Sequence, residues 1–297
     1  MLNVLCGFGI GEVASAFFCS MAAMEKRITR AKKSLAGSKT LFDLSTDDLS
    51  ARLPAVHRAL YLLFNEGYHG ACPEQTVRVG LCREAMELCA LLRATPLTAT
   101  PSTHALSALM CLDAARLGER TDAAGELRTL FEQDRSRWDG ALVADGVQLL
   151  ALSATGTELT EYHVEAGIAA LHAAAARVED TRFDEIVSLY DVLMIVRPSP
   201  VVALNRAIAV AQAEGPDRGI EELRAIGGRE RLDRYPFYAA ALGELERRRG
   251  RLAIARRHFG RAAELARNER ERRFLEARAR ACAPRSNGAD GPDAERR

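Results

Sequence analysis

The sequence has no run of ~18 consecutive apolar residues and no basic leader at its start, so it predicts neither a transmembrane helix nor a signal peptide. Its seven cysteines form no Cys-x-x-Cys pair and no cluster with histidine, which argues against a disulfide scaffold or a zinc site. No G-x-S-x-G, H-E-x-x-H or P-loop motif is present. We therefore expect a cytoplasmic protein with reduced thiols that is not an enzyme, needs no cofactor or metal, and makes no membrane contact.

The sequence also has almost no charge imbalance. The net charge is +1 over 297 residues, so the whole molecule is not built to bind a polyanion, and any nucleic-acid role must come from a local basic patch. Hydrophobic residues make up 48% of the chain and charged residues 27%, a balance typical of a globular protein with a real core.

Helix-forming Ala, Leu, Arg and Glu dominate, and apolar residues recur at spacings of three and four, so the sequence predicts an all-α protein. We expect a basic N-terminal head over 1–36, a linker over 37–52, a helical extension over 53–282 and a disordered tail over 283–297. Ser45 and Asp48 form a capping pattern for the next helix. The helices of the extension are expected at 53–66, 73–93, 102–116, 122–134, 138–154, 160–177, 182–196, 200–214, 216–226, 235–249, 252–266 and 268–281.

A repeat is visible late in the chain. Small and aromatic residues fall where a tetratricopeptide repeat requires them, at Leu242, Gly243, Gly250, Ala255, Phe259 and Ala262. A weaker match with Leu204, Gly215 and Ile220 lies about 35 residues earlier. Small residues allow paired helices to approach closely, and Phe259 is expected to fill the gap between neighbouring pairs. A generic helical hairpin remains the alternative, and either arrangement predicts stacked helix pairs with an interaction surface.

The head "GEVASAFFCSMAAMEKRITRAKKSL" (11–35) predicts a short helix, a turn and a longer basic helix. Ser20 is the expected N-cap of the second helix. The expected buried residues are Val13, Ala14 and Phe17 in the first helix and Met24, Ile28, Ala31 and Leu35 in the second, which leaves Lys26, Arg27, Thr29, Arg30 and Lys33 on the outer face.

This pattern is that of a helix-turn-helix, whose second helix enters the major groove of DNA. Lysine and arginine would neutralise phosphates, Arg27 or Lys26 would reach guanine edges, and Glu25 would accept from a cytosine amine. A solvated basic face on an ordinary helix pair is an equally good interpretation of the residues alone. A dinucleotide site at Gly9, Gly11 and Ala14 is disfavoured, because no strand–helix–strand series follows it.

Two further stretches are conspicuous. In "FNEGYHG" (64–70) a catalytic pair of Glu66 and His69 is possible, but Gly67 looks like a left-handed helix end, so we expect a structural role. In "FEQDRSRWD" (131–139) we expect the single tryptophan, Trp138, to be a packing anchor, with an interface role as the alternative. The charged residues of this stretch are candidates for a buried polar network: Asp134, Arg135, Arg137 and Asp139.

The head resembles region 4 of extracytoplasmic-function sigma factors, which reads the −35 promoter element. Glu12-Val13-Ala14, Ser20, Arg27 and Arg30-Ala31-Lys32 stand in the positions of that motif. Further stretches resemble one subgroup of these factors, which carries a long tetratricopeptide-like C-terminal extension. These stretches are "LYLLFNEGYHG" (60–70), "RTDAAGELRTLFEQDRSRWD" (120–139), "SPVVALNRAIAVA" (199–211) and "ERRFLEARA" (271–279).

The resemblance implies a protein of transcription initiation whose partners are promoter DNA, the RNA polymerase core and a regulatory protein bound to the extension. Ser20, Glu25, Lys26, Arg27, Thr29, Arg30 and Lys33 would form its DNA-binding site. This chain starts inside region 4, so region 2, which binds the core and melts the −10 element, is expected to be absent from it. The alternative is a stand-alone helical scaffold that binds proteins and carries a vestigial head.

Overall fold

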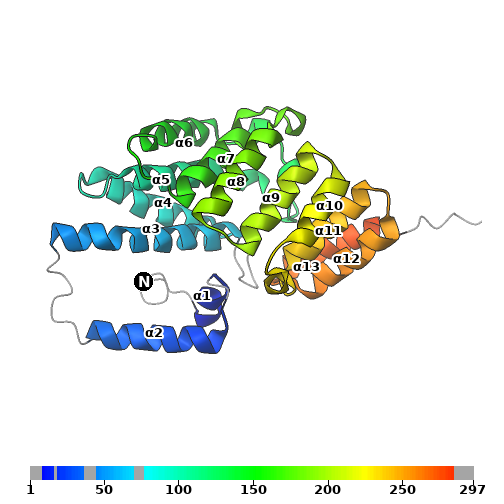
Figure 1. Cartoon of the computed structure of the whole chain (residues 1–297), viewed down its shortest axis with the longest axis horizontal. Helices are drawn as coiled ribbons and strands as arrows, with labels where there is room; N and C mark the ends of the chain where they lie inside the picture. Colours follow the sequence, from blue (N-terminus) through cyan, green and yellow to red (C-terminus); the bar gives the residue numbers. More distant parts are fainter. Residues whose placement is uncertain (1–8, 17–18, 37–44, 70–76, 284–297) are drawn as a thin grey trace, which may run out of the picture.

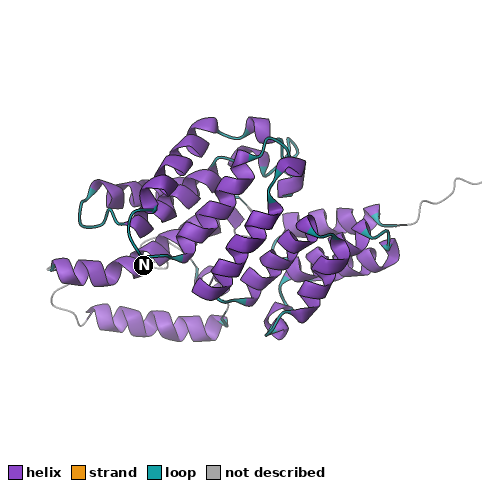
Figure 2. Ribbon diagram, turned by 45° about the horizontal axis from the view of Figure 1, so that its top comes forward, coloured by secondary structure: helices purple, strands orange, loops and turns teal. Residues whose placement is uncertain are grey.

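The computed structural model describes residues 9–16, 19–36, 45–69 and 77–283. Helices make up this part of the chain, which contains no β-strand, only an isolated bridge between Thr121 and Leu127 (Figures 1 and 2). The all-α prediction is therefore confirmed for the described residues. None of their helices combines the length and the apolar composition that a bilayer crossing requires.

The helices follow one another in an uninterrupted series. Their bounds are α1 Ile10–Ala16, α2 Met21–Ala36, α3 Thr46–His69, α4 Val79–Ala94, α5 Pro101–Ala114, α6 Gly140–Ser153, α7 Glu161–Ala174, α8 Phe183–Val196, α9 Pro200–Ala213, α10 Pro216–Ala225, α11 Pro236–Arg248, α12 Leu252–Glu264 and α13 Glu269–Ala281. From α5 onward the predicted bounds agree with these to within a few residues, apart from the predicted helix over 122–134. The predicted tail lies outside the described residues except for Ala283.

Helix α3 begins earlier than predicted because its N-terminus is capped as the sequence suggested. The Ser45 hydroxyl accepts from the Asp48 backbone N–H at 3.1 Å, and the Asp48 carboxylate accepts from the Ser45 N–H at 3.3 Å. This reciprocal pair satisfies N–H groups that have no partner inside the helix. The prediction of a linker over 37–52 is therefore wrong for 46–52, which are helical, while 37–44 lie outside the described residues.

The segment between α5 and α6 is not the helix predicted over 122–134. It contains 3₁₀ turns at Leu117–Glu119, Leu130–Glu132 and Arg135–Arg137. The Asp122 carboxylate accepts from the N–H groups of Ala124 and Glu126, and Gly125 adopts a φ of 77°. These local bonds offer the backbone an alternative to the helix, and Gly125 supplies the left-handed conformation that the turn needs.

Helices α3 to α12 form five successive hairpins, and each hairpin has a glycine where its two helices cross. A Cβ atom added to that glycine would lie less than 3.4 Å from an atom of the partner helix, which is closer than most Cβ contacts in proteins. These contacts are Gly67 with Cys82 at 2.8 Å, Gly146 with Leu112 at 2.6 Å, Gly167 with Leu189 at 3.3 Å, Gly219 with Ala211 at 2.3 Å and Gly243 with Phe259 at 3.0 Å. The paired helices thus approach so closely that a side chain at Gly67, Gly146 or Gly219 would require its neighbours to move, while one at Gly167 or Gly243 would be tight.

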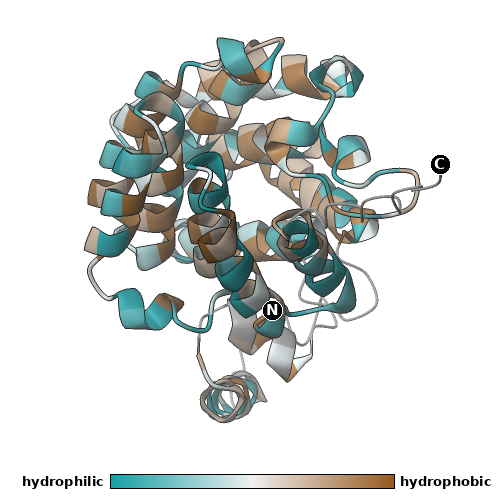
Figure 3. Cartoon of the chain, turned by 90° about the vertical axis from the view of Figure 1, so that its right-hand side faces the viewer, coloured by the Kyte–Doolittle hydropathy of each residue, from teal (hydrophilic) through white to brown (hydrophobic). Residues whose placement is uncertain are grey.

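Neighbouring hairpins bury a continuous series of apolar clusters. α5 packs on both α6 and α7, α8 packs on α9, and α12 packs on α13. Viewed along the long axis, the helices are arranged in a ring, with hydrophilic and apolar residues alternating around each one (Figure 3). We call the side of the stack that faces the centre of this ring its inner side.

The N-terminal helices belong to the same core. Val13, Ala14 and Met24 are buried in one cluster with Leu63 of α3, against which Ile28 of α2 also packs. Figure 1 shows α2 lying alongside α3. The position of α2 is therefore set by the body of the protein.

Replacement of Gly67 tests the close approach of helices. In Gly67→Ala the new Cβ would lie 2.8 Å from the Cys82 backbone N and 2.9 Å from the Arg78 carbonyl, and backbone atoms do not move cheaply. We expect the free energy of unfolding, measured by urea denaturation, to fall by roughly 1–3 kcal/mol.

Gly260→Ala is the matched control, because Gly260 lies in the middle of α12 with no atom within 4 Å of the Cβ position. This variant should gain roughly 0.5–1 kcal/mol from helix propensity. Equal effects of the two substitutions would contradict the role assigned to Gly67.

Candidate functional site

The start of α2 is fixed by Ser20. Its hydroxyl accepts from the Ala23 backbone N–H at 3.3 Å, as an N-cap residue does, so the N-cap prediction is confirmed. The Ser20 hydroxyl is therefore used in capping the helix. Ser20 itself is exposed and lies at the N-terminal end of α2.

The predicted site residues of α2 lie together on its solvent side. All are exposed: Glu25, Lys26, Arg27, Thr29, Arg30 and Lys33. Within the described part of the chain, no carboxylate lies within 4.0 Å of the cationic nitrogens of Lys26, Arg27, Arg30 or Lys33. The Arg30 Nε instead donates to the Lys26 carbonyl at 3.3 Å. The structure thus leaves these cations available to an external partner, and it does not identify that partner.

The opposite side of α2 agrees with the predicted buried stripe only in its first half. Met24 is 5% exposed and Ile28 is half-buried, but Ala31 is exposed, so the prediction is wrong for Ala31. The seven-residue α1 is too short to cover the later turns of the sixteen-residue α2. The other stripe residues, Phe17 and the Leu35 side chain, lie outside the described residues.

A second set of functional groups lies on the inner side of the hairpin stack. We call Tyr68, Asp113, Arg116 and Arg120 the inner polar cluster. The guanidinium carbons of Arg116 and Arg120 lie 5.2 and 4.1 Å from the centroid of the Tyr68 ring. Arg116 pairs with Asp113 at 2.9 Å, and Arg120 has no carboxylate partner among the described residues. The buried aromatic ring thus fixes two cations side by side.

The cluster extends to α7 and α8. The carboxyl of Glu165 faces the Tyr61 hydroxyl, and desolvation raises the pKa of Glu165 to about 7. Burial, followed by the charge of Glu165, also raises the pKa of Tyr190. Glu165 therefore carries a proton for part of the time near neutral pH, as its low-dielectric surroundings disfavour the charge.

Sequence reasoning did not find this cluster, because its members come from helices far apart in the chain and match no motif. "FNEGYHG" gave the nearest signal. The predicted structural role of Glu66 agrees with its ion pair to Arg78 at 2.7 Å. The His69 Nδ1 accepts from Arg120 at 3.2 Å, since a guanidinium can only donate.

The expected left-handed helix end at Gly67 is wrong. Gly67 lies inside α3, is absent from the glycines of positive φ, and serves close packing against α4. Glycine is therefore needed at position 67 because it has no side chain to obstruct α4, and not because the backbone adopts a positive φ there.

The stretch around Trp138 differs in part from its prediction. Trp138 is 8% exposed, as expected of an anchor, and the Arg135 guanidinium lies 5.5 Å from its ring centroid. The predicted buried network is wrong for Asp134, Arg137 and Asp139, which are exposed. The two aspartates are instead used as helix caps, Asp134 for Arg135–Arg137 and Asp139 for α6.

No group of His, Cys, Asp and Glu side chains in the described residues has the geometry of a metal site. The His163 Nδ1 is used at the N-cap of α7, where it lies 2.9 Å from the Thr160 hydroxyl. For the disfavoured dinucleotide site, Gly11 lies inside α1 and not in a loop before it, and the residues of a preceding strand lie outside those described.

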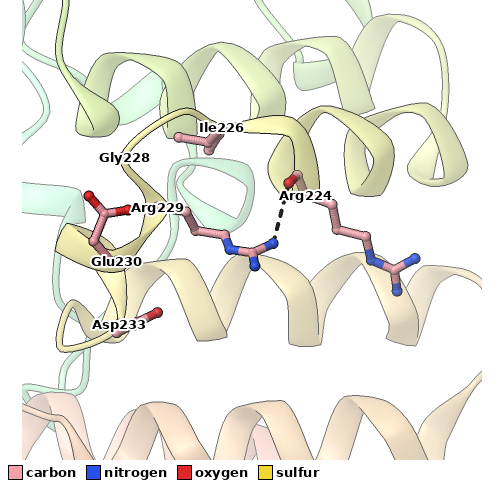
Figure 4. Close-up of a pocket in the computed structure, with 6 residues that line it drawn as sticks. All are labelled: Arg224, Ile226, Gly228, Arg229, Glu230 and Asp233. Atoms are coloured by element: carbon pink, nitrogen blue, oxygen red, sulfur yellow. Dashed lines mark hydrogen bonds between the residues drawn. The ribbon is translucent and has the colours of Figure 1, made fainter.

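A polar recess of about 350 Å³ lies at the turn between α10 and α11, next to Gly228 (Figure 4). Its lining carries Arg224 and Arg229 beside Glu230 and Asp233, and Arg229 Nη1 donates to the Arg224 carbonyl at 3.3 Å. These opposed charges select neither an anion nor a cation.

Two comparisons relate the chain to known proteins. Residues 52–154, which contain most of α3, all of α4 to α6 and the inner polar cluster, match a family of unknown function (DUF6596). The chain is also 38% identical over 276 residues to an uncharacterized protein of Rhizobium meliloti (strain 1021), an alignment that covers 92% of this chain. The chain spans 64% of the length of that relative.

The buried His57 makes a pH-dependent contribution to stability. Its Nε2 lies 2.8 Å from the Thr103 hydroxyl, the residue is 3% exposed, and burial lowers its pKa from 6.5 to about 4. Between pH 6.5 and about 4, the His57 imidazole is therefore protonated in the unfolded chain but neutral in the folded chain. The stability is complete above pH 6.5 and is lost as the pH falls toward 4, by about 3 kcal/mol at about 1.4 kcal/mol per pKa unit.

Urea denaturation from pH ~7 to ~4 measures this loss. His57→Gln keeps a hydrogen-bonding group next to Thr103 but removes the titration, so its stability should fall less steeply over the same interval. Parallel curves for the two proteins would contradict the assignment to His57.

Proposed function

We propose that this chain is the DNA-binding C-terminal part of an extracytoplasmic-function sigma factor, which reads a −35 promoter element with α2. The observation that carries the proposal is the exposed face of α2, where Lys26, Arg27, Arg30 and Lys33 have no carboxylate partner among the described residues. On this proposal the protein acts in transcription initiation without enzymatic chemistry of its own.

The arrangement of α1 and α2 supports a helix-turn-helix. A seven-residue helix is followed by the four residues 17–20 and then by a capped sixteen-residue helix. In this motif the N-terminal residues of the second helix contact base edges. Here Glu25, Lys26 and Arg27 occupy such positions, and Arg30 and Lys33 follow along the same exposed side.

The charge distribution supports the same partner. The whole chain has a net charge of +1, yet α2 carries five basic residues and one acidic residue. A cationic side chain without a carboxylate partner in the described residues can pair with a DNA phosphate. The counterion bound to that phosphate is then released, which favours binding. By contrast, the arginines of α12 and α13 include several that pair with carboxylates, among them Arg261 with Glu264 and Arg273 with Glu126.

The extension is proposed to be tetratricopeptide-like. Successive hairpins with a glycine at each crossing support this, as does the pair of turn glycines Gly215 and Gly250, which have φ values of 99° and 73°. The ring of Phe259 occupies the space beside Gly243, because a Cβ atom added to Gly243 would lie 3.0 Å from that ring. Such stacks present surfaces to partner proteins, so we assign contacts with a regulatory protein and the RNA polymerase core to the extension.

The double variant Arg27→Ala, Arg30→Ala tests the DNA-binding face. We expect the full chain to select a duplex from a random library, and the variant to bind that duplex much more weakly. The slope of log affinity against log salt concentration should become shallower by about 2, because two phosphate contacts are lost. Fluorescence anisotropy between ~50 and ~200 mM salt measures both quantities.

Arg256→Ala, Arg257→Ala is the matched control, since it removes the same charge from exposed positions of α12. This control should keep both the affinity and the slope. If the α12 variant loses binding while the α2 variant retains it, the site assignment is overturned.

A stand-alone scaffold for protein partners, with a vestigial head, is the second candidate. The regular hairpin stack favours it, because such a stack functions without a DNA-binding module. No DNA binding by the full chain at ~50 mM salt would favour this candidate over the first.

A further inference from the structure

The inner side of the extension brings together guanidinium groups of which carboxylates pair with only some. Arg116 and Arg120 both lie against the Tyr68 ring, and Asp113 pairs with Arg116 alone. A third guanidinium, that of Arg135, belongs to the segment between α5 and α6. This segment returns to the end of α5, where the Asp139 N–H donates to the Ala115 carbonyl at 2.9 Å.

Arg135 is held in place with only part of its hydrogen-bonding capacity used. Its Nη1 donates to the carbonyls of His172 and Ala175, at 2.9 and 3.0 Å, which fixes it against the end of α7. Its Nε and Nη2 are buried and have no hydrogen-bond partner among the described residues. The Arg120 Nε is likewise a buried donor without a partner in that part of the chain. The His172 Nδ1 is also buried and unpaired there, as a donor or an acceptor according to its tautomer. Buried donors are normally satisfied, so the unused donors of Arg120 and Arg135 call for an acceptor.

Electrostatic interactions connect Arg135 and His172 with Arg116. Burial, and then the charges of Arg116 and Arg135, lower the pKa of His172 to about 3. Burial, and then the charge of Arg116, lower the pKa of Arg135, while Glu179 and Asp180 act in the opposite sense. Burial acts to lower the pKa of Arg116, but Tyr68 and Asp113 raise it on balance. The positive charges are thus partly compensated by groups of the chain, and a bound anion would add to that compensation.

We propose that Arg116, Arg120 and Arg135 form a binding site for a small ligand that carries an oxyanion, either a phosphate or a carboxylate. The guanidiniums supply planar donors suited to both groups. This site lies in the extension and stands independently of DNA binding by α2.

Trp138 provides the readout. It is the single tryptophan of the chain and its ring lies 5.5 Å from the Arg135 guanidinium, so its emission reports on a ligand bound there. Inorganic phosphate and acetate are titrated separately into the full chain at constant ionic strength, with chloride as the replaced anion. We expect a saturable change in emission with at least one of the two, and the responding probe identifies the oxyanion. A response equal to that of chloride, or one that does not saturate, would overturn the proposal.

Variants then locate the site. Arg116→Gln should weaken the apparent affinity about tenfold or more, whereas Arg218→Gln, on the exposed side of α10, should leave it unchanged. If Arg116→Gln fails to fold by circular dichroism, Arg120→Gln replaces it, because Arg120 has no carboxylate partner in the described residues. Wild-type affinity in the folded arginine variant would rule out this location.

A measurement on the unaltered chain completes the test. An anion bound beside His172 should raise the pKa of that histidine, observed by NMR, because it offsets the charges of Arg116 and Arg135. An unchanged His172 pKa at saturating probe would place the anion elsewhere and overturn the proposal.

Discussion

The close approach of paired helices is the constraint on which the rest of this structure depends. Each hairpin of the extension places a glycine at its crossing, and at Gly67, Gly146 and Gly219 even a single added carbon would fall within 3.0 Å of the partner helix. Backbones this close bring the apolar faces of both helices into one cluster, which then continues into the next hairpin, as the cluster of α3, α4 and α5 does. The stack and its inner side follow from this arrangement.

The inner side has a different chemistry from the core that supports it. Tyr68 is 1% exposed and belongs to the apolar cluster shared by α3 and α4, yet its ring carries two guanidiniums on the inner side. The same cluster includes Val13 and Met24 of the head. One apolar cluster therefore contacts the elements of both candidate sites, the basic face of α2 and the inner polar cluster.

Local patterns predicted much of this architecture. Capping residues and prolines mark helix starts directly, as Ser45, Ser199 and Asn268 do, because the bonds they make span only three residues. The segment between α5 and α6 was mispredicted because turns made by Asp122 and Gly125 outweigh its helix-forming composition. The exposure of Ala31 depends on where α1 ends, which periodicity within α2 does not encode.

The two candidate sites differ in how far the sequence reveals them. The basic face of α2 lies on one helix, so spacing along the chain is enough to predict it. The inner polar cluster joins Tyr68 of α3 and Asp113 of α5 with Arg116 and Arg120, which follow α5, and no local pattern relates residues so far apart. Tertiary structure is needed to bring them together.

Hydrogen–deuterium exchange of the full chain, with and without a duplex selected from a random library, tests the central claim most directly. If α2 is the DNA-binding element, bound DNA should slow exchange over residues 21–36 and leave the hairpins from α5 to α13 unchanged. Protection confined to the hairpins, or equal exchange with and without bound DNA, would contradict the account.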